Sequence, residues 1–187
     1  MTTASIIVYV LFILCLTTPV VTRAVGLISS DDKPMKKLWI PLMFGLTQGV
    51  AAVIGYNVGR LISHLFTYIA DYLVFAMMLV MAVKMFIDSM RVLKGKMLYT
   101  IRNNWDILAL TVLAAMNTLL MSLTCFHFMP FGIWFLVAVV AAGFLWAFFT
   151  IRIPFTPGVI KKVSFIEFSA SVFMVIIAVL YLFTAII

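Results

Sequence analysis

The chain has 187 residues, of which 66% are hydrophobic and 10% are charged, and its formal net charge is +7. Its mean hydropathy is +1.25. A soluble domain of this length does not sustain such values, so the composition excludes a soluble protein and indicates an integral membrane protein.

Apolar runs follow one another along the whole chain, each about twenty residues long, which is the length that crosses a roughly 30 Å hydrocarbon layer at 1.5 Å per residue. Helices satisfy their own backbone groups in lipid, so the fold class is an all-α membrane protein. We expect a single transmembrane domain over residues 1–187, with the short connections leaving no room for a soluble one. The predicted helices are 4–22, 38–59, 68–90, 107–128, 131–151 and 164–186, with a basic central loop over 91–106.

The first run is interpreted as a retained helix, because no charged region precedes it and no A-x-A-like cleavage site follows it. Within its segment "LCLTTPVV", Pro19 cannot donate a backbone hydrogen bond and its ring crowds the carbonyl group of Cys15. We expect a kink here. Either the hydroxyl groups of Thr17 and Thr18 satisfy the backbone, or they and the freed carbonyl group offer oxygen ligands inside the membrane.

The second helix carries small residues on one face: Gly45, Ala52, Gly55 and Gly59 share with Gln48 a stripe at spacings of three and four. Small residues let helices approach closely in lipid, so this stripe is predicted to face protein and to turn Gln48 inward.

Gln48 lies about 15 Å into the second helix, and Asn117 lies at a similar depth in the fourth. Each amide is explained either by a hydrogen bond between helices, worth about 0.6–2 kcal/mol, or by a place in a transport pathway. Their matching depth in corresponding helices of the two halves favours the pathway.

The third helix ends in "VKMFIDSMR", which sets Lys84, Asp88 and Arg91 on one face. This spacing predicts an ion-paired cluster near the cytoplasmic interface, acting either as a set of anchors or as a gate. The acidic residues are all expected in loops or toward helix ends: Asp31, Asp32, Asp71, Asp88, Asp106 and Glu167.

The basic residues are distributed unevenly among the connections, with Arg60 alone on one side. The others are Arg23, Lys33, Lys36 and Lys37 in the first loop, Lys84, Arg91, Lys94, Lys96 and Arg102 around the third, and Arg152, Lys161 and Lys162 around the fifth. The positive-inside rule therefore places loops one, three and five in the cytoplasm and both termini outside. The basic residues are an orientation signal and a contact for anionic lipid, not a nucleic-acid site.

Three helices on each side of the central loop predict that the second half is inserted upside down relative to the first. Such 3+3 inverted repeats are a recurrent plan of secondary transporters, whose substrate sites lie near the membrane midplane.

Three segments between Pro41 and Leu123 resemble the MntP-type manganese efflux pumps, six-helix proteins of the lysine-exporter superfamily: "FGLTQGVAAVIGY", "VFAMMLVMAVKMFIDSMR" and "LAAMNTLLMS". The resemblance implies a transporter of the bacterial cytoplasmic membrane that is not an enzyme, with manganese(II) as its substrate and no cofactor. Lys84, Asp88 and Arg91 match the family's basic, acidic and basic positions.

The chain also departs from that family. The family has carboxylates where this chain has Gln48 and Asn117, and an acidic motif where its first helix has "LTTPV". Manganese prefers carboxylate, carbonyl and water oxygens, and neutral amides compensate a dication less well in a low dielectric.

Three functions remain open at this point. The first is export of manganese or a related cation driven by an ion gradient, because the sequence has no G-x-x-x-x-G-K-[ST] nucleotide loop. The second is transport of a neutral or zwitterionic solute. The third is a CcdA-like thiol electron carrier using Cys15 and Cys125, against which neither cysteine adjoins a proline and the two lie at different depths. The expected partners are the lipid bilayer and a small cation or solute.

Overall fold

The computed structural model describes residues 3–25, 27–28, 34–65, 70–94, 99–100, 104–128, 132–153 and 156–186. The helices are α1 (Thr3–Thr17), α2 (Pro19–Val25), α3 (Pro34–Leu65), α4 (Ala70–Leu93), α5 (Asn104–Phe128), α6 (Ile133–Arg152) and α7 (Pro157–Ile186). Two short strands, β1 (Leu27–Ile28) and β2 (Tyr99–Thr100), form a parallel pair.

Within these residues, five helices are long and apolar enough to cross a membrane. Their apolar segments are Leu38–Ile62, Asp71–Leu93, Trp105–Thr124, Ile133–Arg152 and Pro157–Phe183, and the shorter apolar segment Tyr9–Val25 precedes them. Each of these helices exposes large apolar side chains, such as Val50, Val80 and Leu180, while polar side chains such as Gln48 and Glu167 are buried. This distribution suits a lipid solvent, and the predicted all-helical membrane fold is confirmed.

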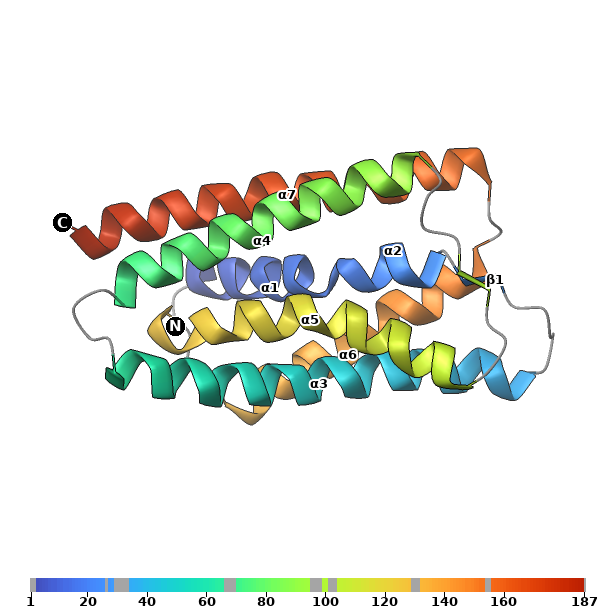
Figure 1. Ribbon diagram of the computed structural model, residues 1–187, viewed down its shortest axis with the longest axis horizontal. Helices are drawn as coiled ribbons and strands as arrows, with labels where there is room; N and C mark the ends of the chain where they lie inside the picture. Colours follow the sequence, from blue (N-terminus) through green and yellow to red (C-terminus); the bar gives the residue numbers. More distant parts are fainter. Residues whose placement is uncertain are drawn as a thin grey trace.

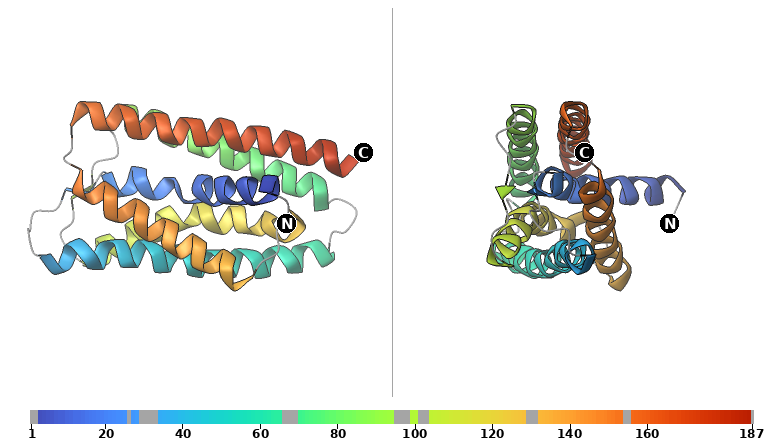
Figure 2. Two further views of the ribbon diagram at one scale, coloured as in Figure 1. Left: turned by 180° about the vertical axis from the view of Figure 1, so that it is seen from behind. Right: turned by 90° about the vertical axis from the view of Figure 1, so that its right-hand side faces the viewer.

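The helices form two groups with the broken first span between them (Figure 1). On one side α3 packs against both α5 and α6, and on the other α4 packs against α7. The end-on view in Figure 2 shows α2 lying between these groups, with α1 extending outward past α6, and α2 contacts both groups. The core of the protein therefore lies around the first span.

The first span is broken rather than merely kinked. Helix α1 ends at Thr17 and α2 begins at Pro19, with a turn at Thr18. The Thr18 hydroxyl donates to the Cys15 carbonyl oxygen at 2.7 Å, and the Thr17 hydroxyl donates to the Ile13 carbonyl oxygen at 2.9 Å. The Thr18 hydroxyl thus satisfies the carbonyl group that Pro19 leaves without its helical donor.

Several helices extend beyond their predicted bounds, and two of these differences move a charged residue into the bundle. The first span continues to Val25 rather than ending at 22, so Arg23, expected in a loop, lies in α2 with 7% of its surface exposed. Helix α7 begins at Pro157 rather than at 164, so Glu167, expected toward a helix end, lies about three turns inside it and is fully buried. Arg23 pairs with Asp88 of α4, a contact that forms only in the folded bundle.

The first and third connections meet at one end of the molecule. Leu27 pairs with Tyr99 and Ile28 with Thr100, and the α6–α7 connection lies at the same end (Figure 1). The start of α1 and the end of α7 lie at the opposite end. This arrangement agrees with an odd–even alternation of connections across a membrane.

Glycines bring α3 close to both of its neighbours. A Cβ atom on Gly55 or Gly59 would overlap the carbonyl oxygen of Leu119 or Leu123 on α5. On α6, the carbonyl oxygen of Val140 would lie 2.8 Å from a Cβ atom on Gly45. The glycine stripe of α3 therefore lies against helix backbones, and Gln48 lies inward between these contacts.

We expect Gly55→Leu to prevent folding or assembly, because the new side chain meets a backbone carbonyl group that cannot rotate away. The loss of stability should be at least the roughly 1–3 kcal/mol typical of overpacked cores. Gly158→Leu is the matched control, because a Cβ atom at Gly158 meets nothing within 4 Å. Size-exclusion profiles and melting in detergent measure the effect. A monodisperse Gly55→Leu protein that melts like the Gly158→Leu protein would contradict the close contact.

Candidate functional site

The two predicted amides lie at the centre of the bundle, on α3 and α5. Gln48 is 0% exposed and Asn117 is 1% exposed. The Thr118 hydroxyl donates to Gln48 Oε1 and lies 3.5 Å from the Leu16 carbonyl oxygen of α1. Neither Gln48 Nε2 nor Asn117 Nδ2 has a hydrogen-bond partner in the part of the chain that the structure describes. The amides are thus buried with unused donors, and Thr118 links Gln48 to the first span.

Thr17 and Thr18 are buried beside the break in the first span. Their hydroxyl groups donate within α1, to backbone carbonyl oxygens one turn back. A hydroxyl group that donates still has acceptor lone pairs, so these two residues remain neutral oxygen donors.

Asp88 is the centre of a buried ion cluster. Arg23 Nη2 of α2 lies 3.1 Å from Asp88 Oδ2, and both side chains are almost fully buried. Lys84 Nζ lies 4.0 Å from the same oxygen, and Arg91 Nη1 lies 3.9 Å from Oδ1. The three residues predicted from the spacing on α4 are therefore close together, and Arg23 is a fourth member that sequence analysis placed elsewhere.

Lys84 connects this ion cluster to the amides, because its ammonium group donates to Asn117 Oδ1. The Cα–Cβ bonds of a helix tilt toward its N-terminus, and the N-terminus of α4 lies away from the β1–β2 end. The Lys84 side chain therefore slopes into the bundle rather than toward the nearer interface.

Glu167 of α7 is the residue that sequence analysis missed most clearly. Its side chain is fully buried, and neither carboxylate oxygen has a hydrogen-bond partner among the residues described. Arg23, Lys84 and Asp88 are the charged groups within its electrostatic reach. A signal was present in the sequence: Ser164, Glu167 and Ser171 recur at helical spacing and mark an inward polar stripe.

Serine side chains hold α7 against α4 on both sides of Glu167. Ser89 and Ser164 donate to each other's carbonyl oxygens at 2.8 and 2.9 Å. The Ser171 hydroxyl donates to the Ala82 carbonyl oxygen at 2.8 Å. These bonds fix the position of Glu167 relative to α4.

The interior therefore offers carboxylate, amide and hydroxyl oxygens, a set that suits hard cations. The buried Arg23 and the partly exposed Lys84 lie near two buried carboxyl groups, those of Asp88 and Glu167. In the described part of the chain, no three His, Cys, Asp or Glu side chains come together as a metal site. The structure thus corrects the expectation that all acidic residues lie near helix ends.

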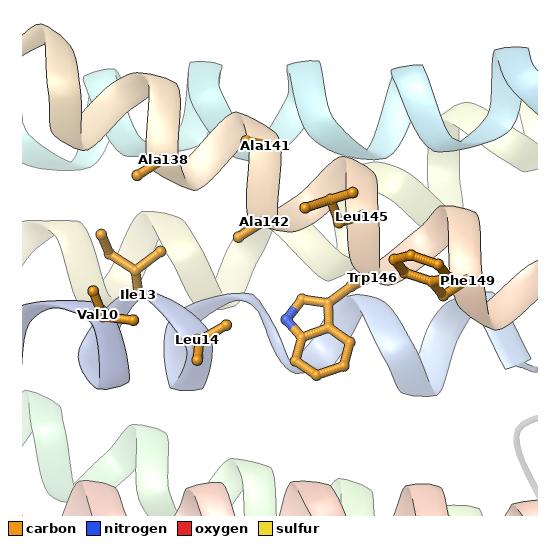
Figure 3. Close-up of a pocket in the computed structure, with 9 residues that line it drawn as sticks. All are labelled: Val10, Ile13, Leu14, Ala138, Ala141, Ala142, Leu145, Trp146 and Phe149. Atoms are coloured by element: carbon orange, nitrogen blue, oxygen red, sulfur yellow. The ribbon is translucent and has the colours of Figure 1, made fainter. Parts of the chain in front are cut away.

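A separate groove of about 410 Å³ lies between α1 and α6 (Figure 3). Its lining is apolar and includes Val10 and Leu14 from α1 and Leu145 and Trp146 from α6. No charged side chain lines it, so it does not extend the polar interior.

Of the two cysteines, Cys15 is buried in α1 with a free thiol group. The side chain of Cys125 lies outside the part of the chain whose side chains are described.

A comparison with known families matches residues 31–153 to the MntP family, described as "Putative manganese efflux pump". No curated protein and no solved structure matches the chain. The matched segment contains Gln48, Lys84, Asp88 and Asn117, whereas Arg23 and Glu167 lie outside it. The resemblance seen in the sequence is confirmed, and the chain belongs to the MntP family of manganese efflux pumps, which are membrane transporters and not enzymes.

Proposed function

We propose that this chain is a secondary carrier that exports manganese(II), or a closely related divalent cation, from the bacterial cytoplasm along a pathway past Gln48 and Asn117. The observation that carries the proposal is the buried polar array that runs from these amides to Asp88 and Glu167. Polar and ionisable groups inside a membrane are costly and mark substrate pathways. The family match supplies manganese and efflux as the substrate and direction.

The charge of the interior supports a cation as substrate. The amides at Gln48 and Asn117 replace carboxylates of the family and by themselves compensate a dication poorly. Asp88 and Glu167 provide buried negative charge at a neighbouring level of the bundle. Oxygen ligands of this mixed kind suit manganese, which is a hard ion.

An inverted 3+3 repeat is part of this proposal. If the first span corresponds to α5, α3 to α6 and α4 to α7, then the pairs α3·α6 and α4·α7 lie across the axis that relates the halves. The contact of α3 with α5 has a counterpart in the contact of the first span with α6, and α4·α5 has one in the contact of the first span with α7. Exchange of the halves therefore preserves the main helix contacts, as alternating access requires.

The ion cluster is proposed as the cytoplasmic gate. Lys84, Asp88 and Arg91, with Arg23, lie between the amides and the β1–β2 end, which the basic connections assign to the cytoplasm. A cation that enters from that end meets the carboxylates before the amides.

Metal-resolved uptake into inverted membrane vesicles tests the function. We expect vesicles containing the protein to accumulate manganese in preference to magnesium and calcium when an ion gradient is present. Vesicles without the protein provide the background. Accumulation of an amino acid without any metal would instead support a carrier for neutral or zwitterionic solutes, to which the free amide N–H groups of Gln48 and Asn117 would donate.

The orientation is tested by single cysteines at Ser30, Gly95 and Thr67 in a Cys15→Ser, Cys125→Ser background. These positions lie outside the described residues, so the labelling is an independent measurement. Cysteines at Ser30 and Gly95 should resist a membrane-impermeant thiol reagent in intact cells, whereas one at Thr67 should react. The reverse pattern would place both termini in the cytoplasm and overturn the proposed direction of transport.

Restoring carboxylates tests the pathway residues. We expect Asn117→Asp, above all with Gln48→Glu, to fold and to export manganese better than the unaltered protein. The neighbouring Lys84 ammonium group compensates the new charge, so the cost should stay near the roughly 2.5–3.5 kcal/mol of insertion scales. Protein abundance and manganese export are measured together.

Asn57→Asp is the matched control, because Asn57 is an exposed amide on α3 that bonds only its own helix, at the Val53 carbonyl oxygen. It should give no gain in export. If the double variant is abundant and monodisperse but exports no more manganese than the control, the amides serve only to hold helices together.

A further inference from the structure

We propose that the Lys84 ammonium group is a tethered cation that occupies a substrate site formed by Asn117, Asp88 and Glu167, and that a divalent cation from the cytoplasm displaces it. The inference rests on the proposed function and adds to it the identity of the site and the way its affinity is set. Glu167 lies outside the segment matched to the family.

The surroundings of the ammonium group are those of a bound cation. Asn117 Oδ1 accepts its hydrogen bond, Asp88 Oδ2 lies 4.0 Å away, and Glu167 attracts it electrostatically. These side chains come from three different helices, α5, α4 and α7. The Asn117 and Asp88 oxygens converge on the ammonium group, and Glu167 adds negative charge from α7; carboxylate and amide oxygens are also the ligands that hard cations take.

Glu167 gives independent evidence for a ligand that the resting arrangement lacks. Its carboxylate is fully buried and no described residue forms a hydrogen bond of normal geometry with either oxygen; the neighbouring Thr22 hydroxyl donates to the Pro19 carbonyl oxygen instead. A carboxylate removed from water and left without a direct partner is unfavourable unless a cation joins it. The charged groups that face it are Arg23 from α2 and Lys84 and Asp88 from α4.

The two basic side chains differ in their freedom to move. The Arg23 side chain is 8% exposed and is held by Asp88 at 3.1 Å. The Lys84 side chain is 36% exposed and lies 4.0 Å from the same carboxylate. Lys84 can therefore withdraw its ammonium group toward the exposed face of α4 while Arg23 keeps Asp88 in place.

The charge of the site explains how exchange of the Lys84 ammonium group for a divalent cation would serve transport. With Lys84 in the site, Arg23 and Lys84 balance the charges that Asp88 and Glu167 carry when both are ionised, while Arg91, whose side chain is 62% exposed, is screened; when Lys84 withdraws, one net negative charge remains among the buried groups and attracts a cation. A bound dication then leaves one positive charge in excess, so the returning ammonium group competes with it. Competition of this kind favours release, which a carrier needs at the end of each cycle.

The test is manganese binding to the full-length protein in detergent, followed by the electron paramagnetic resonance signal of free manganese(II). Lys84→Met should bind manganese at least about tenfold more tightly. The interaction free energy of two unit charges at this distance is larger than the free energy that corresponds to a tenfold change in affinity. Glu167→Gln should bind at least about tenfold more weakly for the same reason. The double variant should lose the gain of Lys84→Met.

Asp71→Asn is the control, because Asp71 is a carboxylate at the opposite end of the same helix pair, where it accepts from Tyr181. It should bind like the unaltered protein. A gain of affinity in Lys84→Met cannot come from misfolding. The Lys84→Met measurement therefore tests the proposal by itself if Glu167→Gln folds poorly.

Affinities of Lys84→Met and Glu167→Gln equal to that of the unaltered protein would overturn the tethered-cation site; if vesicles still accumulated manganese, the proposed function would stand without it. If neither the unaltered protein nor Lys84→Met bound manganese, and vesicles accumulated none, both the site and the proposed function would fail.

Discussion

The buried carboxylate of Asp88 is the group on which the rest of the interior depends. Through Arg23 it joins α4 to the first span, and through Lys84 it leads to Asn117 on α5. These contacts connect the α4–α7 pair to the other helices. Helices α4 and α7 pack closely against each other and much less closely against the rest of the bundle. Removing one partner of such a pair costs about 3–5 kcal/mol, because the other charge is left buried and uncompensated. The position of α4 and the electrostatics of the site are thus set by the same interaction.

The sequence predicted those features that depend on local pattern. Apolar length indicated the spans, the spacing of Gly45, Gly55 and Gly59 indicated the inner face of α3, and the spacing on α4 indicated the ion cluster. Each of these follows from helix geometry within one segment. The inverted repeat, the orientation and the roles of the amides stay predictions.

Sequence analysis missed Arg23 and Glu167 because their burial depends on partners that are distant in the chain. Arg23 and Asp88 are 65 residues apart in the sequence, so no local pattern indicates that they are in contact. Glu167 was placed near a helix end because the polar first turns of α7, with Lys161 and Lys162, resemble a connection. The inward direction of Lys84 likewise follows from the polarity of α4 relative to α5, which only the packing determines.

The glycine contacts of α3 have a mechanical consequence. Where a helix backbone touches another backbone, as at Gly55 and Gly59, no rotamer can change to admit a new arrangement. Helices α3 and α5 therefore behave as one rigid body, whereas the α4–α7 pair meets the remainder through side chains, both core methionines such as Met81 and Met85 and the polar contacts of Lys84 and Asp88. A change of shape that opens the interior is therefore easier at that second boundary, which also holds the buried charged groups.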